Sequence, residues 1–90
     1  MISLSILFSG RGSNANSIIN LIMKKKLNFK LKNIVCNNKG ALGIKLIKKQ
    51  KFDIKIVDIR SYKDKNQYNI DLERALDPEN NDLLLLCGYM

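Results

Sequence analysis

The sequence predicts an α/β fold built on a parallel sheet with flanking helices. Strand-like and helix-like segments alternate along the chain, a glycine-containing turn joins the first strand to the first helix, and the last strand is an uninterrupted run of leucines. The chain has 90 residues, of which 46% are hydrophobic, so the composition allows one core. We expect a single domain over residues 1–90.

The first two segments have the clearest patterns. Residues from Ile2 to Phe8 are mostly apolar and partly β-branched, and they predict a buried strand. The stretch from Asn14 to Lys26 has apolar residues at the spacing of one helical face, so it predicts an amphipathic helix. The three lysines at its end suit the negative pole of a helix dipole.

The remaining segments repeat the alternation. We expect a strand over Lys32–Cys36, a helix over Ala41–Lys51 and a strand over Asp53–Val57. Residues Ser61–Asp64 have the spacing of a helix-start box, and they precede a third helix, which Pro78 and the polar residues after it end.

The fourth strand, Leu83–Cys87, does not alternate between apolar and polar residues, which predicts that both of its faces are covered. In a Rossmann-like sheet of strand order 3-2-1-4 this strand lies at the edge, where bare leucines favour aggregation. We therefore expect further strands after Met90, so that the chain is the first half of such a fold, truncated after its fourth strand. The alternative is that a dimer partner covers a strand that ends the chain.

Several classes of protein are excluded by composition. No apolar run reaches the roughly 18 residues that a membrane span needs, and the first eight residues lack the features of a secretory signal. Cys36 and Cys87 form no C-x-x-C pair, so we expect two reduced thiols and a cytoplasmic location. The chain has no histidine, which removes the commonest general base and metal ligand, and we expect no metal site.

Positive charge is concentrated in the first half of the chain. Residues 1–52 contain Arg11, ten lysines and no acid, whereas residues 53–90 contain eight acids and five bases. This distribution suits an anionic ligand, and phosphate is the obvious class. Nucleic acid is the other candidate, but most of the lysines fall at predicted helix ends and loops, where a solvated surface accounts for them. We therefore expect no nucleic-acid partner.

The turn from Gly10 to Asn14 has the features of a phosphate-binding loop. Its two glycines permit a sharp turn and leave room for a ligand to approach the backbone. The first N–H groups of the following helix have no partner within the helix, so a phosphate placed there accepts several hydrogen bonds at once. The Ser13 hydroxyl and the Asn14 amide add further donors. Alternatively, or in addition, Ser13 or Asn14 acts as the N-cap of the helix.

The residues after the turn narrow the identity of the phosphate ligand. Gly10, Gly12 and Ala15 match the dinucleotide pattern G-x-G-x-x-A, which by itself is a weak signal. NAD requires an acid about 20 residues later, and the first acid of this chain is Asp53. NADP, with Lys39 at its extra phosphate, stays open, whereas a Walker loop is excluded because no Gly-Lys-Ser/Thr follows the glycines.

Four stretches of the sequence resemble the phosphoribosylglycinamide formyltransferase family. The run Leu7–Asn14 resembles the S-G-x-G-S-N opening of that family, and Val35–Lys39 resembles its second strand and the turn after it. Tyr62–Leu72 is similar to the family's F-x-x-R-x-x-F-x-x-x-L helix, and Leu85–Met90 is similar to its L-A-G-[FY]-M strand end. The stretches occur in the family's order and resemble the first half of its length. The related formyltetrahydrofolate deformylases lack the G-S-N turn, which favours the transferase.

The resemblance implies an enzyme of de novo purine biosynthesis that transfers a formyl group from 10-formyltetrahydrofolate to glycinamide ribonucleotide. It implies that the substrate is bound by Gly12, Ser13, Asn14 and Gly88. Lys65 replaces a family arginine near the folate, where lysine keeps the charge but loses the planar fork. Met90 begins the segment that contacts the folate.

The catalytic asparagine, histidine and aspartate of the family follow its fourth strand, so the resemblance implies that no catalytic residue lies within these 90 residues. In the family these groups polarise the formyl carbonyl, relay protons and stabilise the oxyanion. Asp58, Asp64 and Asp71 do not substitute for them. Asp64 falls at a predicted helix start and Asp71 on an exposed helix face, so we expect surface roles for these two residues. The chain alone is therefore expected to be inactive. The alternative function is a non-catalytic module that binds a phosphosugar or a nucleotide.

Overall fold

A four-stranded parallel sheet organises the chain, whose structure is a computed structural model that describes residues 1–87. Its strands are β1 (Ile2–Phe8), β2 (Phe29–Cys36), β3 (Lys55–Ile56) and β4 (Leu83–Cys87). The strand order is β3-β2-β1-β4, which confirms the predicted fold class and topology. The helices are α1 (Ser13–Met23), α2 (Leu42–Lys48) and α3 (Lys65–Leu76), and the two 3-10 turns are η1 (Ile59–Ser61) and η2 (Pro78–Asn80).

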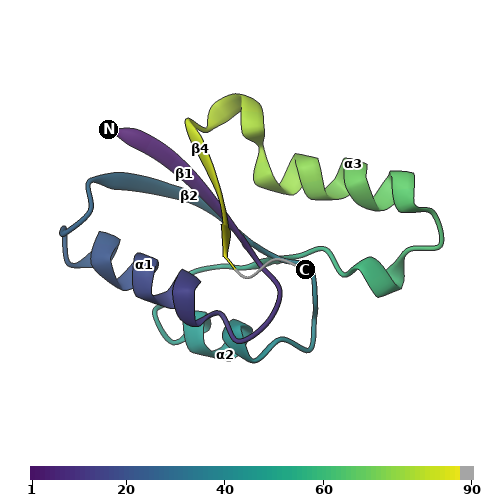
Figure 1. Cartoon of the computed structure of the whole chain (residues 1–90), viewed down its shortest axis with the longest axis horizontal. Coiled ribbons are helices and arrows are strands. Elements are labelled where there is room, and N and C mark those ends of the chain that lie inside the picture. The colour runs from purple at the N-terminus through teal and green to yellow at the C-terminus, as the bar shows by residue number, and fades with distance from the viewer. Residues whose placement is uncertain (88–90) are drawn as a thin grey trace.

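The helices cover the two faces of the sheet (Figure 1). α1 and α2 pack on one face, and α3 packs on the other. Alternation along β1 sends Leu4, Ile6 and Phe8 into the cluster beneath α1 and α2, whereas Leu7 packs beneath α3. Each of these four side chains is at most 2% exposed, so β1 is buried on both faces, as expected at the centre of a parallel sheet.

β2 is longer than predicted, because it begins at Phe29 rather than at Lys32. Its first residues alternate between apolar and basic side chains, so they do not read as a continuous apolar run. They nevertheless pair with the start of β1, where Leu4 lies opposite Leu31 and the next pair is Ser5 with Asn33. Lys32 is therefore an extra residue in the ladder, a bulge that the side-chain pattern does not reveal.

The two outer strands are exposed. β3 has two residues instead of the predicted five, because only Lys55 and Ile56 pair with β2. β4 has the predicted bounds, and β1 is its neighbour within the described sheet. Leu83, Leu84 and Leu86 are 46%, 43% and 59% exposed. The described residues thus leave these three leucines of the strand uncovered, and the expectation of further strands stays a prediction.

α1 ends at Met23, three residues before the predicted end at Lys26. The Lys26 N–H donates to the Leu21 carbonyl, and the Lys25 N–H donates to the Ile22 carbonyl. These two bonds form a Schellman motif, which ends a helix by placing one residue in left-handed backbone. That residue is Lys25, with a φ of 59°.

The other two helices also differ from prediction at their ends. α2 ends at Lys48 rather than at Lys51, where left-handed backbone with a φ of 66° excludes a helix. The predicted start of α3 is wrong: Ser61 belongs to η1, and Asp64 caps the helix by accepting a hydrogen bond from the Asn66 N–H. Aspartate and serine are equally good N-caps, so the sequence did not distinguish Ser61 from Asp64. In the structure the helix begins after Asp64. Within the described chain, no helix is long and apolar enough to cross a membrane.

Both cysteines are free thiols in the interior of this fold. Cys36 and Cys87 both pair with Phe8, one from each side, so β1 separates them. Two strand spacings of about 4.8 Å exceed the separation of about 7 Å beyond which two Cα atoms do not bridge. The topology therefore keeps the two thiols apart.

We predict that Lys25→Gly stabilises the chain. Glycine adopts left-handed backbone without the steric cost of about 1 kcal/mol that other residues bear, so the free energy of unfolding in urea should rise by up to that amount. Lys24→Gly is the matched control, because the φ of Lys24 is −83° and glycine gains nothing there. A Lys25→Gly variant less stable than the parent chain would contradict the motif.

Candidate phosphate-binding site

Gly12 is the turning point between β1 and α1. Its φ of 69° and ψ of 14° lie in the left-handed region, which glycine adopts without a Cβ clash. A Cβ at this position would also lie 2.8 Å from the Cα of Gly43, which is too close for two carbon atoms. Both the backbone conformation and the available space therefore require glycine here.

The first amides of α1 are available to a ligand. The first helical bond runs from the Asn16 N–H to the Gly12 carbonyl at 2.7 Å, so the helix offers no acceptor to the N–H groups of Ser13, Asn14 and Ala15. Ser13 and Asn14 are exposed. The alternative that one of these two residues is the N-cap is wrong: Gly12 is the N-cap, because its left-handed backbone places Ser13 in the first turn.

The loop between β1 and α1 lines a hollow of about 230 Å³. The residues around this hollow are Gly10, Arg11, Gly12, Ser13, Asn14 and Cys87. It lies at the carboxyl ends of β1 and β4, which are neighbours in the sheet although β2 and β3 come between them in the chain. In open α/β sheets, ligands bind at such a switch point in the strand order.

The lining of this hollow suits an anion. Arg11 contributes a positive charge, the described residues that line the hollow include no acid, and the start of α1 adds partial positive charge. Burial raises the pKa of the Cys87 thiol, so this side chain is neutral at physiological pH. A phosphate placed here meets hydrogen-bond donors and positive charge without an opposing fixed negative charge.

A second hollow, of about 310 Å³, adjoins the loop at Gly10. Its other lining residues are Ser9, Asn37, Asn38, Ile59 and Arg60. The asparagines follow β2, where a dinucleotide site would have its ribose-binding acid. Lys39, on which the NADP alternative depends, does not line the hollow, and its N–H is bonded to Asp58.

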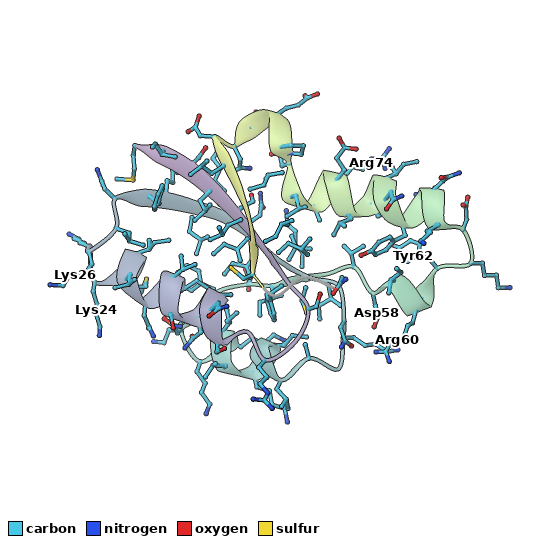
Figure 2. All side chains as sticks on the ribbon, viewed as in Figure 1. Lys24, Lys26, Asp58, Arg60, Tyr62 and Arg74 are labelled. Carbon is cyan, nitrogen blue, oxygen red and sulfur yellow. The ribbon has the colours of Figure 1, made fainter. Side chains whose placement is uncertain are left out.

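Asp58 ties the loop after β2 to the loop after β3 (Figure 2). Its buried carboxylate accepts hydrogen bonds from the N–H of Lys39 at 2.9 Å and from the N–H of Arg60 at 2.8 Å. The Arg60 guanidinium lies 3.5 Å from Asp58 and donates to the Asn38 Oδ1 at 2.7 Å. The two backbone N–H groups, followed by the guanidinium, lower the pKa of Asp58 to about 2. Asp58 is therefore ionised at neutral pH and holds two loops at the edge of the site.

Asp64 and Asp71 also have structural partners. Asp64 caps α3 through the Asn66 N–H at 2.9 Å. Asp71 accepts a hydrogen bond from the Tyr62 hydroxyl at 2.6 Å, and this bond is the first cause that lowers the pKa of Asp71. The bond joins α3 to Tyr62, the residue after η1. Asp58 holds the residues before η1, so the loop is fixed at both of its ends.

The structure brings together three of the residues that the sequence indicated for ligand binding. Gly12, Ser13 and Asn14 line one hollow, whereas Lys65 is the first residue of α3, on the other side of the sheet from α1, and lines neither hollow beside the loop. Gly88 and Met90 lie outside the described residues. Two contributors were missed: Cys87, which β4 places beside the loop through its pairing with β1, and Asp58, which ties two loops. The sequence signal for Cys87 was its position at the end of a strand.

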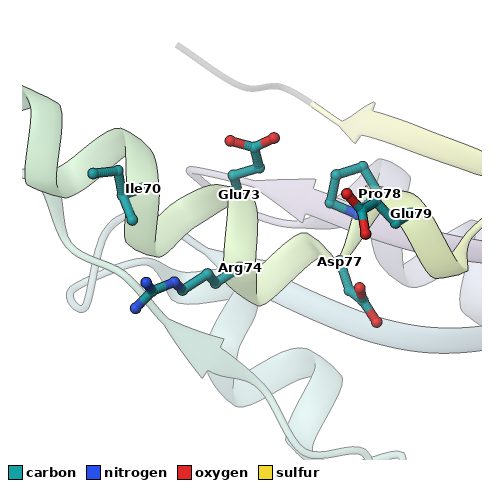
Figure 3. Close-up of a pocket in the computed structure, with 6 residues that line it drawn as sticks. All are labelled: Ile70, Glu73, Arg74, Asp77, Pro78 and Glu79. Atoms are coloured by element: carbon teal, nitrogen blue, oxygen red, sulfur yellow. The ribbon is translucent and has the colours of Figure 1, made fainter.

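The hollow at the end of α3 does not form a comparable site (Figure 3). It is lined by Ile70, Glu73, Arg74, Asp77, Pro78 and Glu79. The carboxylates of Glu73 and Asp77 point in opposite directions, so they do not converge on a common ligand. The hollow also comes before β4, so it lies toward the amino ends of the strands, whereas the loop after β1 lies at their carboxyl ends.

We predict that Asp58 makes the stability of the chain depend on pH between about pH 4 and pH 2. A carboxyl group whose pKa is lower in the folded chain stabilises the fold above its unfolded pKa of about 3.9. That contribution is lost as the pH falls through the folded pKa of about 2. Asp58→Asn should therefore lower the free energy of unfolding at neutral pH and flatten its decline on acidification, measured by urea titration.

Asp53→Asn is the control for this measurement. Asp53 is exposed, and its side chain accepts no hydrogen bond from any described residue. The Asp53→Asn variant should keep the acid-dependent decline of the parent chain. If Asp58→Asn declined as steeply as the parent, the Asp58 bonds would not contribute to stability.

Comparison with known proteins gives a consistent result. Residues 3–90 match the formyl transferase family. The phosphoribosylglycinamide formyltransferase of Dictyostelium discoideum is 26% identical in an alignment 96 positions long, which covers 98% of this chain. The crystal structure of phosphoribosylglycinamide formyltransferase from Campylobacter jejuni is 29% identical, with a TM-score of 0.86 over 99% of this chain. The corresponding structure from Bacillus halodurans is 26% identical, with a TM-score of 0.81 over 98% of this chain.

The chain spans about half the length of these relatives. It covers 47% of the Dictyostelium protein, 48% of the Campylobacter chain and 45% of the Bacillus chain. The similarity nevertheless extends over nearly the whole of this chain, from β1 through β4, and includes the glycine loop. The chain therefore belongs to the formyl transferase family.

Proposed function

We propose that this chain supplies the substrate-phosphate site of an enzyme that transfers a formyl group from 10-formyltetrahydrofolate to the amine of glycinamide ribonucleotide, in de novo purine biosynthesis. The observation that carries the proposal is the loop at residues 12–14, whose helix-start amides border a hollow that suits an anion. Membership of the family supports the reaction class, and the names of the Dictyostelium and Campylobacter relatives support the substrate.

In this proposal the 5′-phosphate of glycinamide ribonucleotide accepts hydrogen bonds from the N–H groups of Ser13 and Asn14. The left-handed backbone of Gly12 turns the chain so that these N–H groups border the hollow, and the Ser13 hydroxyl adds a donor. The position of the hollow, between the carboxyl ends of β1 and β4, directs the rest of the substrate along the edge of the sheet where ligands of this architecture bind. On the family resemblance, Gly88 is also kept as a substrate contact.

The folate contacts in the proposal are Lys65 and Met90. Lys65 is exposed at the first position of α3, so its ammonium is available to a carboxylate of the folate. An ammonium attracts a carboxylate as a point charge, without the paired hydrogen bonds of an arginine. Orientation of the folate therefore depends on other contacts, among which the proposal counts Met90.

The chemistry itself requires groups that this part of the fold does not supply. Transfer needs a base for the proton of the attacking amine and donors for the developing oxyanion. Among the residues lining the loop hollow, the ionisable side chains are Arg11 and Cys87, and burial raises the pKa of the Cys87 thiol, which opposes its use as a base. We assign the catalytic asparagine, histidine and aspartate to sequence outside these 90 residues.

The proposal also includes a further strand beside β4. Leu83, Leu84 and Leu86 are about half exposed on the outermost strand of the described sheet, and the relatives are about twice as long as this chain. A neighbouring strand would cover these leucines and satisfy the unpaired edge of β4. Such a strand would also bring additional residues to the edge of the sheet that carries the loop.

The alternative function is a non-catalytic module that binds a phosphosugar or a nucleotide. The observation that favours it is that residues 10–14, which would bind the phosphate, and the hollow that they line all lie within this chain. This alternative and the enzyme proposal share the same phosphate contacts, so they differ in chemistry rather than in the binding site.

The proposed setting is the cytoplasm, with small molecules as the ligands. Two free thiols agree with a reducing compartment. Lys24 and Lys26 lie beyond the C-terminal end of α1, away from the loop that precedes the helix (Figure 2). This arrangement separates these two lysines from the phosphate hollow, and it supports a small anionic ligand over a nucleic acid.

We predict that Ser13→Ala weakens binding of a phosphosugar by at least about tenfold, because a hydrogen bond to a charged group contributes about 1.5–3 kcal/mol. Ribose 5-phosphate is the probe, and isothermal titration calorimetry is the measurement. Ser17→Ala is the matched control, since Ser17 is exposed one turn further along α1 and does not line the hollow. Equal affinities for Ser13→Ala and the parent chain would contradict the proposed phosphate contacts.

The same variants separate phosphosugar binding from nucleic-acid binding. A nucleic-acid complex held by the lysines would weaken steeply with salt and would not respond to Ser13→Ala.

We predict that the purified 90-residue chain transfers no formyl group. Binding of the substrate phosphate alone provides neither the base nor the oxyanion donors. An assay that follows deformylation of 10-formyltetrahydrofolate should show no rate above the background in the presence of glycinamide ribonucleotide. The control is a full-length enzyme of the same family under the same conditions. Turnover by the 90-residue chain would show that the described residues contain the catalytic groups.

A further inference from the structure

We propose that Gly43, in α2, is a positioning residue that sets the shape of the phosphate-binding loop. The inference rests on the proposed function, because it concerns the same loop, but Gly43 itself does not line the loop hollow. Glycine inside a helix lowers helix stability, so its presence in the seven-residue α2 needs a reason. The contacts of Gly43 provide that reason.

The first contact is a hydrogen bond between two backbones. The Gly43 N–H donates to the Gly10 carbonyl at 3.1 Å. Gly43 is the second residue of α2, so its N–H is one of the donors that the start of a helix leaves without a helical partner. α2 therefore uses an unpaired amide to hold the first glycine of the loop.

The second contact is the direct approach of the α2 backbone to the loop. A Cβ at Gly43 would lie 2.7 Å from the Cα of Gly12, 2.8 Å from the carbonyl oxygen of Arg11 and 2.7 Å from the Phe8 ring. Two of these three neighbours are backbone atoms of the loop, so a side chain at Gly43 is not accommodated by a change of rotamer. The loop itself has to move.

The movement would occur where the phosphate contacts begin. Gly12 is the N-cap of α1, and the next two residues carry the amides assigned to the phosphate. An anion site made of several backbone N–H groups depends on their common direction, so displacing the cap misaligns all of them together. A methyl group at Gly43 is thus expected to weaken phosphate binding without touching the ligand.

The chain contains a matched glycine for comparison. A Cβ at Gly40, three residues before Gly43, would have the Asn38 Oδ1 at 3.5 Å as its nearest neighbour, which is an ordinary contact. Gly40→Ala therefore adds the same methyl group without forcing the loop to shift.

The test measures binding of inorganic phosphate and of ribose 5-phosphate to the 90-residue chain, by following the amide resonances of Ser13 and Asn14. Gly43→Ala should bind both at least tenfold more weakly than the parent chain, and its two amide resonances should be displaced before any ligand is added. Gly40→Ala should bind within twofold of the parent. Leu76→Ala is the stability control: Leu76 is the last residue of α3 and packs in the core cluster on the other face of the sheet from α2, so the substitution should lower the melting temperature but leave the affinity unchanged.

The outcomes separate the two proposals. If the parent chain binds neither probe, the proposed phosphate site is wrong and the inference about Gly43 falls with it. If the parent binds and Gly43→Ala binds within twofold of it, the site stands and the inference is overturned. If Leu76→Ala and Gly43→Ala lower the melting temperature equally and also lose the same affinity, the weaker binding results from the loss of overall stability. The inference is then also overturned.

A measurement on the parent chain covers the case in which Gly43→Ala does not fold. Coupling between two sites is reciprocal, so phosphate at the loop should strengthen the bond from the Gly43 N–H to the Gly10 carbonyl. Saturating phosphate should slow hydrogen exchange at Gly43 severalfold more than at Asp82. The Asp82 N–H is bonded to Ser3 near the amino ends of β1 and β4, whereas the loop lies at their carboxyl ends. Equal slowing at both amides would overturn the inference.

Discussion

Between β1 and α1 the chain passes through left-handed backbone at Gly12 and enters α1 at the next residue. This turn exposes the first amides of the helix at the carboxyl ends of the strands. This geometry is available because two segments meet there without side chains. Gly12 and Gly43 are so close that a Cβ on either would lie within 2.8 Å of the other's Cα. The position of α2 and the conformation of the loop are therefore linked through backbone contact, in addition to the apolar packing beneath both helices.

A polar network holds the neighbouring loops in place. Asp58 is buried and ionised in the loop after β3, and it accepts one N–H group from the loop after β2 and one from its own loop. Tyr62 and Asp71 hold the other end of the same segment against α3. The ends of the strands are thus fixed by side chains that accept or donate specific bonds, whereas the loop from Gly10 to Gly12 depends on backbone contacts and the absence of Cβ atoms. The side-chain bonds and the glycine contacts together fix the positions of the loops at the carboxyl ends of the strands.

The chain spans about half the length of the formyltransferases that it matches. The segment from β1 to β4 carries the loop that we propose binds phosphate, which is a local feature of one strand, one turn and one helix. Formyl transfer needs a base and an oxyanion site arranged around the reacting carbonyl, and the described residues that line the loop hollow do not include a general base. The exposed leucines of β4 mark the edge at which we propose that the rest of the fold joins.

The sequence by itself determined the alternation of strands and helices and the glycine turn, because each depends on a local pattern of apolar residues or on the special backbone of glycine. The strand order followed from the Rossmann-like architecture that this alternation predicts. The sequence also located Gly12, Ser13 and Asn14 in one loop. Tertiary structure decided the rest: the bulge at Lys32, the use of Gly12 rather than Ser13 or Asn14 as the cap, and the approach of Gly43 to the loop. These features arise from contacts between segments distant in the chain, and no local pattern of side chains encodes such a contact.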